Sequence, residues 1–208
     1  AFERNEITAL PQEEIITGNY KYTEGVSVYE FWIEEWAGVS TETGEPMWYE
    51  DVLDEDGNVI GRDTTLIYGD ASGSQIYAGT ALPWGRGGFN TSLRYKGFDL
   101  SALMNFSLGG QILDFDYAGL MEGGLRPGQQ KHTDILDRWQ QPGDVTDVPR
   151  LDPTNQGGST STRWFVDATY ARIRNITLGY TLPQSIVDAS GFLSGLRVFV
   201  SGDNLFTF

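Results

Sequence analysis

Hydrophobic and polar residues alternate most regularly between residues 87 and 108. Side chains alternate across a β-strand, so the pattern predicts two antiparallel strands joined at Lys96-Gly97. The second segment, residues 98–108, has 11 residues. A tilted membrane-spanning strand needs about 9–11 residues, whereas ordinary strands average about 5–6. On one face lie Phe98, Leu100, Ala102, Met104, Phe106 and Leu108; on the other lie Asp99, Ser101, Leu103, Asn105 and Ser107.

The turn between these segments places Tyr95 opposite Phe98. Aromatic residues at that level match the girdle of a membrane barrel, and a two-residue turn matches its periplasmic side. A hairpin of a soluble β-sandwich would show the same alternation. The pattern alone therefore predicts an all-β chain and leaves both architectures open.

Two further segments alternate near the end of the chain. Residues 176–182 place Ile176 and Leu178 opposite Thr177, and the phase shifts near Arg174-Asn175. The shift predicts a β-bulge or a strand that extends beyond the bilayer. A last strand begins near Leu196. Four strands cannot close a barrel, so we expect the sheet to be completed elsewhere.

Residues 109–168 are polar and weakly periodic. Such length is odd inside a compact soluble domain and natural for an extracellular barrel loop. Within it, Trp139 and Trp164 are candidates for ligand stacking; alternatively, they pin the loop to a wall. Upstream, Asp54-Glu55-Asp56-Gly57-Asn58 predicts a hairpin turn. A calcium loop fits poorly, because Val52 would occupy its first ligand position.

Composition narrows the possible functions. The chain has 208 residues, a net charge of −15, no Cys, one His (His132), 27 aromatic residues (6 Trp, 10 Tyr and 11 Phe) and 26 Gly. Many aromatics and glycines suit an all-β chain. The absence of Cys excludes disulfides and thiolate sites, and the negative charge disfavours nucleic acid. Residues 3–7 resemble the end of a strand, so we expect the chain to begin inside a longer protein.

Ordered blocks of sequence carry a resemblance. The blocks are residues 95–101 (YKGFDLS), 136–139 (LDRW), 170–183 (YARIRNITLGYTLP) and 196–208 (LRVFVSGDNLFTF). Over residues 20–208 the chain resembles SusC/RagA-type TonB-dependent transporters. It departs at Ala171, where the family usually carries a bulkier residue.

The resemblance implies an all-β fold: antiparallel strands of a transmembrane β-barrel of about 22 strands with long extracellular loops. Residues 1–208 would be the C-terminal part of that barrel, without the plug domain. The implied protein is no enzyme and uses no cofactor. It imports glycans or peptides across the Gram-negative outer membrane, together with a SusD-like surface lipoprotein. TonB would act through the absent N-terminal part.

The resemblance also implies that one face of the sheet contacts outer-membrane lipid. The lipid-facing residues would be Tyr95, Phe98, Leu100, Met104, Phe106 and Leu108. The lumen-facing residues Asp99, Asn105, Arg172 and Arg174 would contact an oligosaccharide or peptide, or satisfy hydrogen bonds of the wall. Two alternatives stay open: a secreted carbohydrate-binding module, and a glycosidase fragment using carboxylates such as Asp51 and Asp54.

Overall fold

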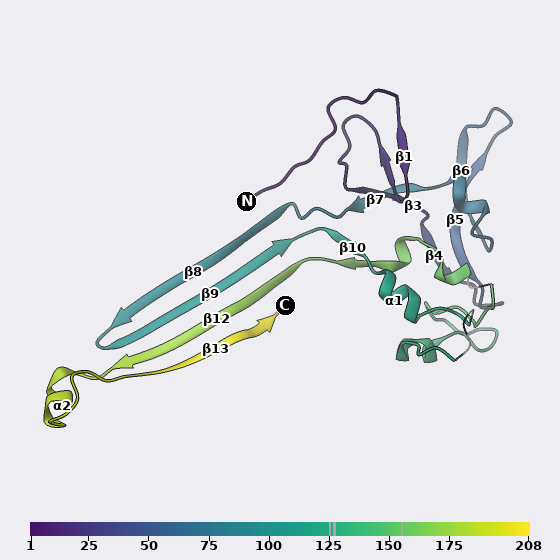
Figure 1. The fold of residues 1–208 in the computed structure, drawn as a ribbon. Coiled ribbons are helices and arrows are strands. Elements are labelled where there is room, and N and C mark those ends of the chain that lie inside the picture. Colours follow the sequence, from purple (N-terminus) through teal and green to yellow (C-terminus); the bar gives the residue numbers. More distant parts are fainter. Residues whose placement is uncertain (125, 127, 155) are drawn as a thin grey trace. The chain divides into compact units, whose positions relative to one another are not determined.

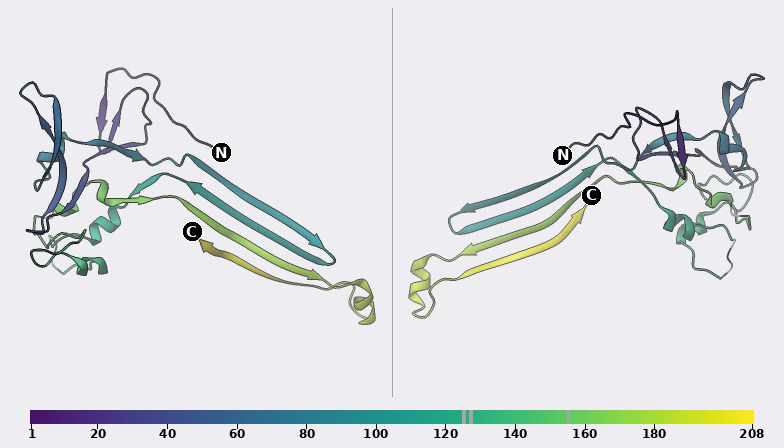
Figure 2. Two further views of the ribbon diagram at one scale, coloured as in Figure 1. Left: turned by 180° about the vertical axis from the view of Figure 1, so that it is seen from behind. Right: turned by 45° about the horizontal axis from the view of Figure 1, so that its top comes forward.

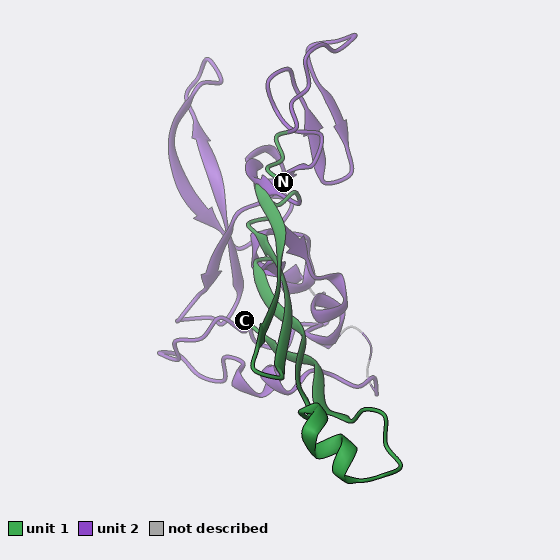
Figure 3. Ribbon diagram, turned by 90° about the vertical axis from the view of Figure 1, so that its left-hand side faces the viewer, with its two compact units in different colours: residues 1–4, 82–110, 168–208 green, residues 5–81, 111–167 purple. Residues whose placement is uncertain are grey.

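The computed structural model describes residues 1–124, 126, 128–154 and 156–208. The fold is mostly β, with antiparallel sheets. It divides into two compact units (Figure 3). Unit 1 comprises residues 1–4, 82–110 and 168–208, and unit 2 comprises residues 5–81 and 111–167.

Unit 1 is built on a four-stranded antiparallel sheet in the order β13-β12-β9-β8 (Figure 1). Its strands have 11 or 12 residues: β8 (Gly85–Tyr95), β9 (Phe98–Leu108), β12 (Tyr170–Thr181) and β13 (Arg197–Thr207). The predicted hairpin is present, with Tyr95 paired to Phe98. Lys96 and Gly97 have φ angles of 46° and 87°, the left-handed backbone that a tight two-residue hairpin turn requires.

The predicted β-bulge is also present. The register of β12 shifts between Ile173 and Asn175 against both neighbouring strands. Against β9, Arg174 is the extra residue. Against β13, the extra residue lies on β13, between Asp203 and Phe206. One added residue restores the alternation on either side of it. The phase shift in the sequence therefore has a local cause within the strand.

Residues 1–4 run antiparallel to the start of β8. Phe2 forms an isolated bridge with Gly85, and the Arg86 amide donates to the Ala1 carbonyl at 2.9 Å. Two long excursions, residues 5–81 and 111–167, therefore leave the strands at the end opposite the Lys96-Gly97 turn. The sequence analysis expected a long loop only in the second.

Unit 2 contains three small antiparallel sheets and short helices. The strands are β1 (Ile15–Thr17), β2 (Tyr20–Tyr22), β3 (Glu30–Ile33) and β7 (Ile76–Thr80) in one sheet; β4 (Trp36–Val39), β5 (Pro46–Leu53) and β6 (Val59–Thr65) in another; and β10 (Gln111–Leu113) with β11 (Phe165–Asp167) in the third. Helix α1 (Phe115–Leu120) lies here, and α2 (Gln184–Ala189) lies in unit 1. In the described part of the chain, no helix is both long and apolar enough to cross a membrane.

The two excursions pack into one body. The ring centroids of Phe31 and Phe165 lie 5.1 Å apart. The Tyr68 hydroxyl donates to the Thr160 carbonyl at 2.9 Å, and the Thr162 amide donates to the Glu34 carbonyl at 3.0 Å. Figure 2 shows the same strands from two further directions. Residues 111–167 thus share an interior with residues 5–81.

The Asp54–Asn58 segment is a hairpin turn, as predicted. It joins β5 to β6, and Gly57 has a φ of 84°. The Asp54 carboxylate accepts hydrogen bonds from the amides of Asn58 (2.8 Å) and Asp56 (3.0 Å). These bonds, led by those from Asn58, hold the pKa of Asp54 below its usual value. The carboxylate that a calcium loop would use serves the turn itself.

Candidate functional site

The candidate site is the sheet of unit 1, because its two faces differ chemically. The pairing register aligns apolar residues of all four strands into rows. Three such rows are Tyr95–Phe98–Tyr180–Val198, Leu93–Leu100–Leu178–Val200 and Phe89–Met104–Ile173–Phe206. The predicted apolar face of β9 therefore extends across the whole sheet.

This apolar face is open rather than packed. Leu93 is 60% exposed and Val200 is 67% exposed. Monomeric soluble proteins seldom show apolar surfaces that continue across a whole sheet. The face needs an apolar environment that unit 1 itself does not supply.

The opposite face carries an ion pair across a strand. Arg197 on β13 donates from Nη2 to Asp99 Oδ2 (2.6 Å) and from Nε to Asp99 Oδ1 (3.0 Å). Gly179 of β12 lies between them. A Cβ on Gly179 would lie 2.5 Å from Arg197 Nη2 and 2.6 Å from Asp99 Oδ1. A side chain at position 179 would therefore displace the Arg197 or Asp99 side chain where the two close over β12.

Neighbouring positions on this face are hydrogen-bonded across strands. The hydroxyls of Thr177 and Ser201 lie 2.8 Å apart, and Asn175 Nδ2 donates to Asp203 Oδ1 at 2.8 Å. Arg172 Nε donates to Thr207 Oγ1 at 3.0 Å. A polar network links the strands along this face.

The structure brings some predicted polar candidates together and separates others. Asn105 pairs directly with Arg172, whereas Asp99 lies towards the other end of β9. The Asn105 Oδ1 atom is buried and has no hydrogen-bond partner within the described residues. Arg174 occupies the bulge. Arg197 and Gly179 were not candidates, although their alternation had already placed them on the polar side.

The two tryptophans singled out in the sequence hold unit 2 together. Trp164 is 2% exposed, packs with Ala118 and Met121, and donates from Nε1 to the Ser159 carbonyl at 2.9 Å. Trp139 Nε1 donates to the Thr41 carbonyl at 3.1 Å. Trp164 thus has no free face for a ligand, and its position fits the packing role.

A cation lies between indole rings in the same interior. The Arg163 guanidinium carbon lies 4.4 Å from the Trp164 ring centroid and 4.7 Å from that of Trp36. Burial lowers the pKa of Arg163 to about 10. Arg163 Nη1 also donates to the Gly157 carbonyl at 2.7 Å. Trp36 belongs to residues 5–81 and Trp164 to residues 111–167, so Arg163 joins the two excursions by contacting both rings.

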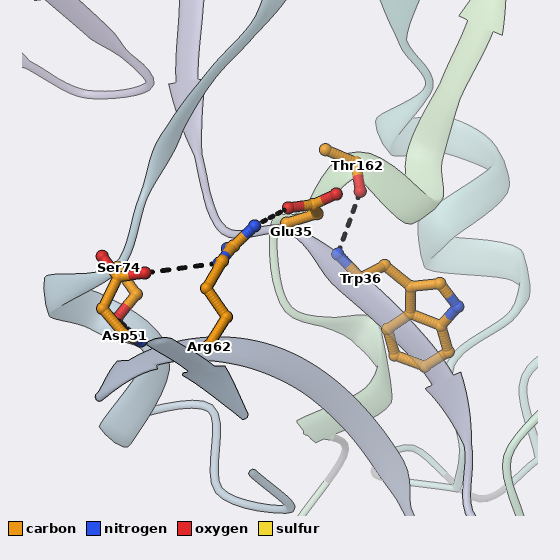
Figure 4. A network of polar contacts seen from close by, with 6 residues as sticks. All are labelled: Glu35, Trp36, Asp51, Arg62, Ser74 and Thr162. Atoms are coloured by element: carbon orange, nitrogen blue, oxygen red, sulfur yellow. Dashed lines mark hydrogen bonds and ion pairs between the residues drawn. The ribbon is translucent and has the colours of Figure 1, made fainter. Parts of the chain in front are cut away.

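Ion pairs also link β5 to β6 and the hairpin to Glu35, the residue before β4 (Figure 4). Arg62 Nη1 lies 2.5 Å from Glu35 Oε2, and Arg62 Nε lies 3.3 Å from Asp51 Oδ1. The Asp51 amide donates to Ser74 Oγ at 2.7 Å. Asp51, once a candidate catalytic carboxylate, is thus part of a structural network. Among the described residues, no group of three His, Asp or Glu side chains is arranged to hold a metal ion.

Comparisons with known proteins agree with this geometry. No family model matches the chain. TonB-dependent receptor P3 of Formosa agariphila is 36% identical over 121 residues, which cover 58% of this chain and 11% of the relative. TonB-dependent receptor P39 of the same organism is 28% identical over 156 residues, which cover 73% and 15%.

Solved structures match nearly the whole chain. The RagAB peptide importer in its closed-closed state has a TM-score of 0.75 at 26% identity, covering 96% of this chain and 22% of that one. A second RagAB peptide transporter structure has a TM-score of 0.68 at 27% identity, covering 99% and 21%. The chain thus spans about a tenth to a fifth of the length of the proteins it matches.

By its fold, its two-faced sheet and these matches, the chain is similar to a segment of TonB-dependent receptors, a class of outer-membrane proteins. Within that class, the chain is most like the SusC/RagA type, to which its structural matches point. The resemblance seen in the sequence is confirmed.

Proposed function

We propose that unit 1 is part of the wall of a transmembrane β-barrel that imports nutrients. One observation carries this proposal: apolar rows cross four strands of 11 or 12 residues and remain exposed. Strands of that length suffice to cross the hydrocarbon core. In lipid, Tyr95, Phe98, Leu100, Met104, Phe106 and Leu108 would be covered without any protein partner.

The open edges of the sheet support a larger barrel. In the described residues, no strand pairs with the outer edge of β13, and only residues 1–4 pair with the outer edge of β8. Unpaired strand edges invite pairing with further strands. The rest of a barrel of about 22 strands would supply them.

The connections indicate the orientation. Short turns lie on the periplasmic side of outer-membrane barrels, and long loops lie outside the cell. The Lys96-Gly97 end is therefore periplasmic, and residues 5–81 and 111–167 are extracellular. Unit 2 would then face a SusD-like surface lipoprotein that helps to capture cargo. TonB would act on a plug that this chain does not contain.

The polar face would line the lumen, with Asp99, Asn105, Arg172 and Arg174 as the candidates for cargo contact. Asp99 and Arg172 already have partners within the sheet. Asn105 Oδ1 has none among the described residues, and a buried acceptor without a partner is costly. Asn105 is therefore the candidate with unused hydrogen-bonding capacity, although cargo would reach its buried oxygen only if neighbouring side chains moved.

For the cargo we propose an oligopeptide ahead of an oligosaccharide. Exposed loop tryptophans would favour sugars, because they stack on pyranose rings, but every tryptophan of unit 2 is at least partly buried. The matched RagAB structures are of a peptide importer. Both observations favour peptides.

Uptake by the full-length protein in cells tests the proposal. Fluorescent oligopeptides and oligosaccharides of matched size are offered to cells with and without the gene, with and without a protonophore. We expect gene-dependent, protonophore-sensitive accumulation of peptides in cells whose transporter fractionates with the outer membrane. Recovery of the protein as a secreted soluble product would overturn the barrel, and uptake of sugars alone would overturn the cargo.

A further inference from the structure

Two connections at the same end of the sheet differ greatly in length. β8 and β9 are joined by Lys96-Gly97 alone, whereas residues 182–196 join β12 to β13 and contain α2. In Figure 1 this segment extends past the end of the strands. Connections on the periplasmic side of outer-membrane barrels are usually short, so the longer one calls for an explanation.

The longer connection has a defined structure. The Leu182 amide donates to the Leu196 carbonyl at 2.9 Å and closes its base. Val187 is 2% exposed. Ser190 Oγ donates to the Val187 carbonyl at 2.6 Å and accepts from the Leu193 amide at 3.1 Å. These bonds fix which side chains point outward.

The large apolar side chains of the connection point outward, beside exposed polar ones such as Gln184 and Ser194. Phe192 is 83% exposed, and Ile186, Leu193 and Leu196 are also exposed. The single charged residue of the connection, Asp188, accepts a hydrogen bond from Gln184 Nε2 at 2.7 Å. Large apolar side chains held outward by a hydrogen-bonded frame indicate a contact surface.

This surface continues the apolar face of the sheet. Leu182 and Leu196 follow Tyr180 and Val198 in the two-residue period of β12 and β13, so both share the apolar side. The last row of that face is aromatic: Phe98 and Tyr180 have ring centroids 4.5 Å apart, and Tyr95 pairs with Phe98. Aromatic rings of this kind concentrate at membrane–water interfaces.

We propose that residues 182–196 form an interfacial anchor, with Ile186, Phe192 and Leu193 inserted into the phospholipid monolayer at this end of the barrel. The inference rests on the proposed function, because it takes the apolar face to be in lipid. Lipid is the expected contact of this surface, because the surface continues the apolar face of the sheet. A short ordered segment with apolar side chains on its outside and little charge can lie at the headgroup boundary.

Nitroxide scanning of the full-length protein in phosphatidylethanolamine and phosphatidylglycerol bilayers tests this. Labels are placed one at a time at Phe192→Cys, Ile186→Cys and Ser194→Cys, with Leu93→Cys as the reference for the apolar face. The chain itself has no cysteine to compete for the label. Collision with oxygen reports lipid, and collision with a water-soluble nickel complex reports water.

We expect labels at Phe192 and Ile186 to match Leu93, with oxygen collision high and nickel collision several-fold lower than at Ser194. Nickel collision at Phe192 equal to that at Ser194 would overturn the anchor. A Phe192 label shielded from both reagents would also overturn it, because a protein would then cover the segment. A Leu93 label that is itself exposed to water would overturn the proposed function as well.

Discussion

The two units bury apolar residues in opposite ways. Among the residues that the structure describes, seven buried hydrophobic side chains lie in unit 2 and only Val187 lies in unit 1. The seven are Phe31, Ile33, Trp48, Ala71, Ala118, Met121 and Trp164. Unit 2 has an interior of its own, whereas unit 1 exposes a continuous apolar sheet face. Since apolar burial is the main favourable term in folding, unit 1 depends on a medium that unit 2 does not need.

The largest expected effect concerns the interior of unit 2. Trp164→Ala should cost about 3–5 kcal/mol of local stability, as for other large aromatic truncations. Hydrogen exchange on the full-length protein should show faster exchange in residues 5–81 and 111–167 and unchanged protection in β9 and β12. Trp84→Ala, which removes an exposed indole of unit 1, is the control. Equal loss of protection in β9 would show that unit 1 depends on unit 2.

The second prediction addresses the faces of the sheet. Ala102→Arg introduces a charge near the middle of the apolar face and should destabilise the protein in vesicles by about 2–4 kcal/mol. Ser101→Arg, one residue away on the polar face, should cost less than about 1 kcal/mol. Denaturant unfolding in vesicles measures both variants. Equal costs would contradict the assignment of the faces.

A smaller effect is expected where Gly179 lies beneath the Asp99–Arg197 pair. Gly179→Ala places a methyl group between these side chains, which must move apart to admit it, and should lower the unfolding midpoint slightly because exposed ion pairs contribute little. Gly61→Ala on β6 is the matched control, because a Cβ there meets nothing within 4 Å. Unfolding midpoints in vesicles distinguish the two. A neutral Gly179→Ala would mean that the pair does not close over β12.

The smallest effect is the pH dependence of the β5–β6 turn. The pKa of Asp54 is lowered in the fold, chiefly by the hydrogen bonds from Asn58. The carboxylate therefore stabilises the turn above its unfolded pKa of about 4, and this stabilisation is lost as the pH falls through the lower, folded pKa. In the wild type, hydrogen exchange of the Asn58 amide, corrected for its intrinsic rate, should accelerate as the pH falls through the folded pKa of Asp54. If Asp54→Asn shows the same acceleration, the carboxylate is not its cause.

Much of unit 1 could be predicted from sequence, because its strands repeat with a period of two and are long. The turn at Lys96-Gly97, the bulge at Arg174 and the apolar face of β9 all follow from that alternation. The Asp99–Arg197 pair could not be predicted, since it depends on the register of three strands. Its only local signal is the glycine at position 179.

Unit 2 could be predicted much less well. Its strands are mostly short and irregular, and its interior joins residues far apart in sequence, such as Phe31 with Phe165 and Tyr68 with Thr160. Residues 109–168 read as a polar loop, because the apolar residues of a small interior are too few to show a period. Trp164 could not be assigned to that interior without knowing that residues 5–81 supply its other side.

The most direct test of the central claim is a nitroxide scan of β9 in the full-length protein in bilayers. Labels are placed singly at each position from Phe98 to Leu108, and oxygen and nickel collisions are compared at each. We expect a period of two, with lipid exposure at Leu100, Ala102 and Met104 and none at Asp99, Ser101 and Asn105. Uniform exposure to water, or loss of the alternation, would contradict the claim that unit 1 is a membrane-spanning wall.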